Sequence, residues 1–315
     1  VYGFPTKYEN SRWILINEDM FKEAGLDIPY DGWTYSEFLA DAEKLTHGEG
    51  QDKVYGVCWA RKQSGKSILY ALDGVLGANQ IYKNEEGTEV NFDNDVYRAG
   101  LNLVKETLDK GYAIPIEDEF SEDISVANTF LQGKCAIMLG VAQMRLCMDQ
   151  ENYPHDFMTA LVPAPVPDDE KYNTEFYRKQ IGTTGAGDLL SISANTKYPE
   201  ASFEFAMWYL KGGMSPLVQG GRIPLWNGVN KDEVLSVLKE KAQGSIDMDS
   251  MENYLSLDTT QGVAAIKGHA SSEISSAWFE EFDAMCYGKQ SVDQTVQNME
   301  KRGNELIQTE LSSQK

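Results

Sequence analysis

Residues 13–27 read WILINEDMFKEAGLD, and they decide the fold because a buried strand runs directly into a capped helix. The four apolar residues 13–16 predict the strand. Asn17 has the side chain of an N-cap and predicts a short helix over residues 18–24, which Gly25 ends. A strand followed at once by a helix is typical of α/β folds.

Helix start and stop signals recur outward from this stretch. Thr34 and Glu37 form a capping box, in which each side chain satisfies a free backbone amide, and they open a helix with Phe38 on its inner face. Asn94 caps a longer helix, which Gly111 stops. Further helices are predicted over residues 124–131, 232–242, 271–287 and 292–307.

Short apolar runs lie between these helices and predict strands over residues 54–59, 135–139, 157–162 and 189–192. Pro199 starts another helix, for which we expect an inward stripe of Phe203, Ala206, Met207 and Leu210. Trp13 and Trp208 are expected in the core. Strands separated by helices imply an α/β fold with a largely parallel sheet.

Length and charge limit the functions open to the chain. Its 315 residues suggest two domains or three, and 28 basic against 49 acidic residues give a formal net charge of −21. Such a field repels phosphate backbones and anionic lipid headgroups, so nucleic-acid and membrane-surface binding are disfavoured. No run approaches the about 18 apolar residues of a membrane-spanning helix, and residues 1–5 do not have the pattern of an export signal.

Catalytic and metal-binding patterns are scarce. The three histidines are scattered, and neither a GxSxG, an HExxH nor a CxxC pattern occurs, so we expect no metal site, no cofactor and no enzyme activity. Of the four cysteines, Cys58, Cys135, Cys147 and Cys286, several lie in apolar runs, as Cys58 and Cys135 do, where a buried free thiol is expected. The cysteines leave the redox compartment open. One alternative remains open, because residues 60–67, ARKQSGKS, fit a loose phosphate-loop pattern with alanine at its first position.

Several segments in order resemble the family 1 extracellular solute-binding proteins, the group that includes maltose-binding protein. Residues 1–5, VYGFP, resemble the family's crossover strand, and WILINEDMFKEAGLD resembles its "YNKDLFEKAGLD" segment. The remaining matches are the threonine-capped helix start at 33–38, FLQGKCAIM at 130–138, SISANTKYPEA at 191–201 and the helix start GKQSVDQ at 288–294. The resemblance extends over nearly the whole chain.

The resemblance implies a type II periplasmic-binding-protein-like α/β fold, with two lobes that close by a hinge on a ligand between them. Residues 1–8 would be the crossover strand, 9–184 and 231–315 the second lobe, and 185–230 a remnant of the first. It also implies that the chain lacks roughly the first hundred residues of the family. We therefore expect mostly one complete lobe and a damaged cleft.

Sugar sites pair aromatic faces with planar polar groups that bind hydroxyls. The resemblance carries the family's ligand contacts onto Tyr8, Asn10, Trp59, Arg61, Gln143, Thr183, Thr184, Arg222, Trp226 and Trp278. Val141 and Ala142 follow Gly140 where many relatives have a stacking tryptophan, which argues against a large oligosaccharide held in the same way.

Each of these contacts has a structural alternative. Trp278 lies in helical register with Ile274 and Phe282, which favours core packing. Trp226 is the right size to cover a loop, and Arg61 and Arg222 also fit as solvated surface charges.

The function implied is the substrate-binding component of a bacterial ATP-binding-cassette importer, which captures a mono- or oligosaccharide outside the cytoplasmic membrane by lobe closure. Its expected partners are the sugar and the membrane permease subunits, with no nucleic acid. We expect a monomer, lipid-anchored in the full-length protein. The alternatives are a phosphate-loop nucleotide-binding enzyme and a ligand sensor module on the same scaffold.

Overall fold

The central sheet of the computed structural model has four strands in the order β3-β4-β2-β5. The strands are β2 (Trp13–Asn17), β3 (Tyr55–Cys58), β4 (Cys135–Leu139) and β5 (Thr159–Pro163). The structure describes residues 3–8, 13–59, 81–121, 126–139, 144–175, 178, 187–213, 215–226, 228–242, 244–256 and 268–313. The predicted strand over residues 13–16 is confirmed, and all five residues of β2 are buried.

Strand directions correct the expectation of a largely parallel sheet. β3 and β4 pair in parallel, but β2 is antiparallel to both of its neighbours, β4 and β5. Three strands thus run one way, with β2 reversed between them. The prediction was wrong for β2 because it assumed that every strand is entered through a crossover helix, whereas β2 follows β1 after only four residues.

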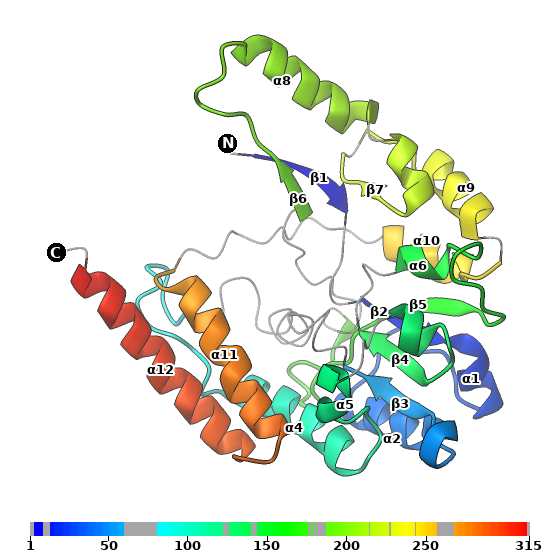
Figure 1. Cartoon of the computed structure of the whole chain (residues 1–315), viewed down its shortest axis with the longest axis vertical. Helices are drawn as coiled ribbons and strands as arrows, with labels where there is room; N and C mark the ends of the chain where they lie inside the picture. The colour runs from blue at the N-terminus through cyan, green and yellow to red at the C-terminus, as the bar shows by residue number, and fades with distance from the viewer. Residues whose placement is uncertain are drawn as a thin grey trace.

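Alternate side chains of β2 belong to two separate hydrophobic clusters, one on each face of the sheet. Ile14 and Ile16 join the cluster that includes the buried faces of α2 (Tyr35–Leu45), α4 (Asp95–Asp109), α11 (Ser271–Cys286) and α12 (Val292–Ser313). Trp13 and Leu15 join the cluster under α9 (Lys231–Ala242) and α10 (Met248–Ser256). Helices therefore cover both faces of the sheet, as Figure 1 shows.

The predicted helix caps are confirmed. Asn17 accepts from the amide of Met20 at the start of α1 (Glu18–Glu23), and Thr34 and Glu37 form both bonds of the capping box of α2. Asn94 caps α4. Residues 126–130 form a π-helical turn where an α-helix was expected. Three helices were not predicted from the sequence: α5 (Ile116–Ser121), α6 (Met144–Cys147) and α10.

Close backbone packing sets α2 against β3. A Cβ atom on Gly56 would lie 2.3 Å from the carbonyl oxygen of Ala42, so only glycine permits this approach. The capping box fixes where α2 begins, and Gly56 fixes how closely its later turns approach the sheet.

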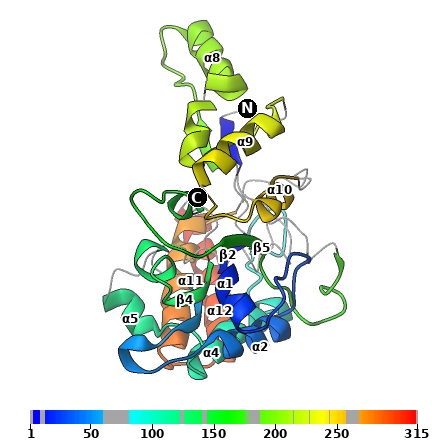
Figure 2. The ribbon, with the colours of Figure 1, turned by 90° about the vertical axis from the view of Figure 1, so that its right-hand side faces the viewer.

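A second, antiparallel sheet has the order β6-β1-β7, with β1 (Phe4–Tyr8), β6 (Gly187–Leu190) and β7 (Ile223–Pro224). Helix α8 (Pro199–Trp208) follows β6, and Phe203 on this helix packs edge-on against Phe4 at 5.9 Å. Figures 1 and 2 both show α8 at the far end of the molecule from α4 and α2. Val218 in the 3-10 turn Ser215–Gly220 and Ile223 pack back into the cluster of α9.

The exposure of α8 corrects two expectations. Ala206 is the only buried residue of this helix, whereas Phe203 is 49% exposed and Trp208 59% exposed, so the predicted inward stripe and the core position of Trp208 are wrong. The apolar spacing of the helix was recognised, but burial needs a complete second layer, and the contact of Phe203 with Phe4 leaves the face largely exposed.

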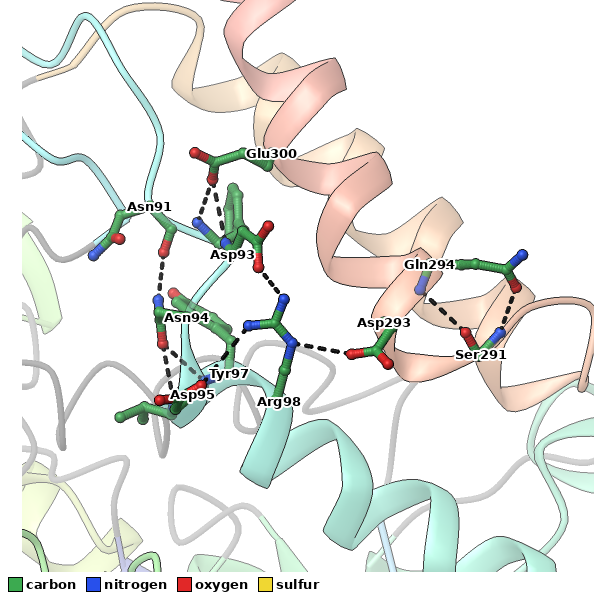
Figure 3. A network of polar contacts seen from close by, with 12 residues as sticks. Asn91, Asp93, Asn94, Asp95, Tyr97, Arg98, Ser291, Asp293, Gln294 and Glu300 are labelled. Atoms are coloured by element: carbon green, nitrogen blue, oxygen red, sulfur yellow. Dashed lines mark hydrogen bonds and ion pairs between the residues drawn. The ribbon is translucent and has the colours of Figure 1, made fainter.

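Polar contacts attach the segment before α4 to α12 (Figure 3). Glu300 accepts from the backbone amides of Phe92 and Asp93, at 2.8 and 3.3 Å, and its other oxygen pairs with Lys83 at 2.6 Å. Arg98 on α4 binds Asp93 and reaches Asp293 on α12 at 3.0 Å. The chain is thereby fixed to α12 just before it enters α4.

Cys58 and Cys135 are buried thiols outside any disulfide, as expected, and Cys147 is likewise buried. Cys286 is partly buried and also forms no disulfide. Burial raises the pKa of Cys147 to about 12, which keeps it protonated and unreactive at neutral pH. Among the described residues, none of the helices has the length and apolar character needed to cross a membrane.

Candidate functional site

The carboxyl ends of β3, β4 and β5 meet at one edge of the central sheet, because these three strands run in the same direction. Trp59 directly follows β3, Leu139 ends β4, and Ala164 directly follows β5. In α/β folds, ligands bind outside the carboxyl ends of the strands, where loops present polar groups above a rigid base. This edge is therefore the candidate site.

Trp59 is held rigidly at this edge. Its side chain is only 5% exposed and packs against Phe38 of α2, with ring centroids 5.8 Å apart. Its indole N–H donates to Thr107 Oγ1 on α4 over 2.9 Å, and that hydroxyl donates to the carbonyl of Val104 at 2.8 Å. The polar atom of Trp59 is thus satisfied inside the protein, and the ring offers neighbouring groups an apolar surface.

The start of α2 is attached to the end of β5 at the same edge. The amide of Tyr35 donates to the carbonyl of Val166 over 2.8 Å, and Trp33 Nε1 donates to the carbonyl of Pro163 at 2.9 Å. The capping box at Thr34 therefore sets the place of Tyr35 as well as the first turn of the helix.

A small apolar pocket lies between these parts, with a volume of about 20 Å³. Its walls include Tyr35, Phe38, Trp59, Leu103, Leu139 and Pro165. Since about 10–15 Å³ holds one water molecule, the pocket is far too small for a sugar ring. No group of three or more histidine, cysteine, aspartate or glutamate side chains in the described ranges could hold a metal ion.

Trp278, a predicted ligand contact, lies in the core of the helical layer. Its side chain is 2% exposed on α11, and its ring stacks on Phe282 with centroids 4.8 Å apart at an interplanar angle of 11°. This placement agrees with the core-packing alternative for Trp278, which shares with Trp59 the cluster under α2 and α4.

Arg222 and Trp226 lie beside β7 of the small sheet. Arg222 is exposed, and Trp226 is 41% exposed with its ring against Gly228, where a Cβ atom would lie 2.5 Å from Cζ2. The amide of Val229 donates to the carbonyl of Trp226, so the ring sits on a tight turn. Trp226 thus covers part of a loop, in line with the structural alternative, while much of its ring stays accessible.

The other predicted contacts lie wholly or partly outside the described residues. The backbone of Tyr8 ends β1, but its side chain is outside the described residues. Also outside them are Asn10, Arg61, Gln143, Thr183 and Thr184, and the phosphate-loop-like residues 60–67.

Comparison with known proteins identifies the family. Residues 2–211 match the model of the bacterial extracellular solute-binding protein family, which is two thirds of the chain. The chain belongs to this family.

Solved structures of solute-binding proteins have the same fold. A substrate-binding protein from Listeria monocytogenes in complex with cycloalternan is 17% identical with a TM-score of 0.69, covering 96% of this chain and 71% of its own. The cyclic α-maltosyl-1,6-maltose binding protein of Arthrobacter globiformis is 15% identical with a TM-score of 0.64, over 94% and 70% of the two chains. The sugar-binding protein MalE of Xanthomonas citri is 17% identical with a TM-score of 0.62, over 98% and 70%.

These findings confirm the periplasmic-binding-protein-like fold expected for this solute-binding protein. They also agree with the expectation of a binding protein, since the family is one of solute-binding proteins rather than enzymes, and its members act outside the cytoplasm.

The residues that support Trp59 in this solute-binding protein were not predicted from the sequence. Thr107 was passed over because a threonine inside a helix carries no pattern of its own, and Tyr35 was considered only as part of a helix start. The capping box was the available signal for Tyr35. It marks Tyr35 as the first residue of α2, and the first turn of this helix lies beside the strand ends.

Proposed function

We propose that this solute-binding protein captures a carbohydrate outside the cytoplasmic membrane and delivers it to the permease subunits of an ATP-binding-cassette importer. The observation that carries the proposal is the family match over residues 2–211. Sugar-binding relatives with the same fold, such as the cyclic maltosyl-maltose binding protein, support a carbohydrate as the ligand.

The proposed cleft lies between two modules: the second lobe, residues 9–184 and 231–315, and the remnant of the first, residues 185–230, joined by the crossover strand 1–8. Support comes from the two separate sheets and from the packing of α9, α10, α11 and α12 beside the four-stranded one. The protein would close these modules on the sugar, and the closed form would be the one that the permease recognises.

For ligand contact we propose Tyr8, Asn10, Arg61, Gln143, Thr183 and Thr184, with Arg222 and Trp226 on the opposite module. Trp226 is the proposed stacking residue, since much of its ring is accessible. For Trp59 and Trp278 we propose a supporting role, because both rings are buried.

Calorimetric titration of the full-length protein with maltose, maltotriose, cycloalternan and a panel of monosaccharides tests the proposal. We expect saturable binding of at least one sugar, and no heat across the panel would overturn a carbohydrate ligand. Trp226→Ala should weaken the binding about tenfold or more, because stacking and ring burial are lost. Trp208→Ala is the matched control, since it removes another accessible tryptophan, 59% exposed against 41% for Trp226, outside the proposed site.

The importer is tested separately with the permease in membrane vesicles. Sugar-loaded protein should stimulate ATP hydrolysis by the importer above the level that the sugar-free protein gives. Sugar binding without any such stimulation would favour a sensor on the same scaffold. We further propose a lipid-anchored monomer, for which detergent partitioning and light scattering of the full-length protein are the tests.

A further inference from the structure

We propose that the pocket beside Trp59 is a subsite for a methyl-sized apolar substituent of the bound sugar, such as the C6 methyl group of a 6-deoxy sugar. This inference rests on the proposed function, and it narrows the substrate class to sugars with such a substituent. It assigns a direct role to a cavity whose walls are otherwise part of the hydrophobic core.

Size is the first argument. The pocket measures about 20 Å³, and a space that holds about one water molecule accepts one methyl-sized group. A hydroxymethyl group, which ordinary hexoses carry at C6, has one more heavy atom and a hydroxyl. The pocket therefore discriminates at this one position of the sugar, while the rest of the ring stays outside.

The chemistry of the walls is the second argument. The indole N–H of Trp59 is already bonded to Thr107 Oγ1, and that hydroxyl donates to Val104. Phe38, Leu103 and Leu139 offer only carbon, and although Tyr35 carries a hydroxyl, the surface that the walls present to the pocket is almost entirely apolar. A hydroxyl that entered would lose its bonds to water without replacement, at a cost of about 1–3 kcal/mol, whereas a methyl group gains from leaving water.

Position is the third argument. Ala164, Leu139 and Trp59 lie where β5, β4 and β3 reach the candidate edge, so the pocket lies at that edge. A sugar bound at this edge would have a substituent within reach of the pocket.

Three sugar pairs that differ only at C6 provide the test: D-glucose with 6-deoxy-D-glucose, L-galactose with L-fucose, and L-mannose with L-rhamnose. Calorimetry with the full-length protein should show that one deoxy sugar binds about tenfold or more tightly than its parent, as expected for one carbon in a fitted pocket. Ala164→Val fills the pocket and should reduce this preference to less than about threefold. Ala160→Val is the matched control, because Ala160 is equally buried in the same cluster but does not line the pocket.

Each outcome decides. Sugars that bind without preference for the deoxy form, or an Ala164→Val protein that folds and keeps the preference, would overturn the subsite and leave the proposed function standing. No binding of any sugar, these pairs and oligosaccharides alike, would overturn both. If Ala164→Val does not fold, as circular dichroism would reveal, the preference of the unaltered protein decides alone.

Discussion

The indole N–H of Trp59 donates to Thr107 Oγ1 over 2.9 Å, and this bond joins the residue that follows β3 to the middle of the helical layer. Both residues are buried, Thr107 completely. This hydrogen bond between two buried side chains therefore fixes the edge of the sheet at which we expect the ligand to bind.

Replacing Thr107 with valine should destabilise the protein by about 1–3 kcal/mol, because the buried indole N–H of Trp59 loses its acceptor. Urea unfolding measures this change. Thr309→Val is the matched control, since Thr309 also donates to a helix carbonyl but is exposed, and its effect should stay below about 0.5 kcal/mol. Equal effects of the two substitutions would contradict the role of Thr107.

Gly56→Ala should lower the free energy of unfolding by about 2–3 kcal/mol, since the new methyl group would meet the backbone of Ala42 and force α2 away from β3. Thermal and urea unfolding provide the measurement. At Gly220 a Cβ atom has nothing within 4 Å, so Gly220→Ala should have little effect. A wild-type stability for Gly56→Ala would show that α2 lies farther from the sheet.

Glu300→Gln should destabilise the protein by about 1–2 kcal/mol. The carboxylate of Glu300 accepts from two backbone amides and pairs with Lys83, and the substitution removes its charge. The loss should shrink at 1 M salt, where ion pairs are screened. Glu305→Gln, in an exposed pair with Lys301 at 4.0 Å, should change stability by less than about 0.5 kcal/mol. A loss that is independent of salt would assign the effect to the amide bonds alone.

Asp41→Asn should stabilise the protein at pH 7.5 by about 1 kcal/mol. This is less than the raised pKa of Asp41 would give for a fully buried group, because the side chain is partly exposed and solvent screens its charge. Burial raises the pKa of Asp41 to about 6, against the attraction of Lys44. The folded protein therefore binds more protons than the unfolded chain between about pH 4 and 6, and the stability from this group falls as the pH rises through that window.

The gain from Asp41→Asn should accordingly disappear near pH 4, where the aspartate is protonated in the folded state at no such cost. Unfolding curves at the two pH values test this. Asp52→Asn, which removes the same charge at an exposed position, is the control. A gain of equal size at both pH values would contradict burial as the cause.

Local signals predicted much of the main layer. The caps at Asn17, Thr34 and Asn94 act through bonds within one helical turn, so the sequence alone locates the starts of α1, α2 and α4. The reversed direction of β2 was not predictable in the same way, because it depends on the second sheet from which the chain arrives.

Burial was predicted less well than periodicity. Phe203 and Phe282 both lie on apolar helix faces, yet the first is 49% and the second 1% exposed. Only the presence of a facing layer separates them, and spacing carries no information about it. Among the candidate contacts, Trp278 lies in the core, as its helical register favoured, whereas Trp226 is 41% exposed.

The central claim is that the protein binds a carbohydrate and releases it unchanged. Calorimetric titration of the full-length protein with the sugar panel, followed by chromatography of the recovered sugar, tests it most directly. The account predicts saturable heat for at least one sugar and recovery of that sugar intact. The absence of heat for every sugar, or recovery of a cleaved or modified one, would contradict it.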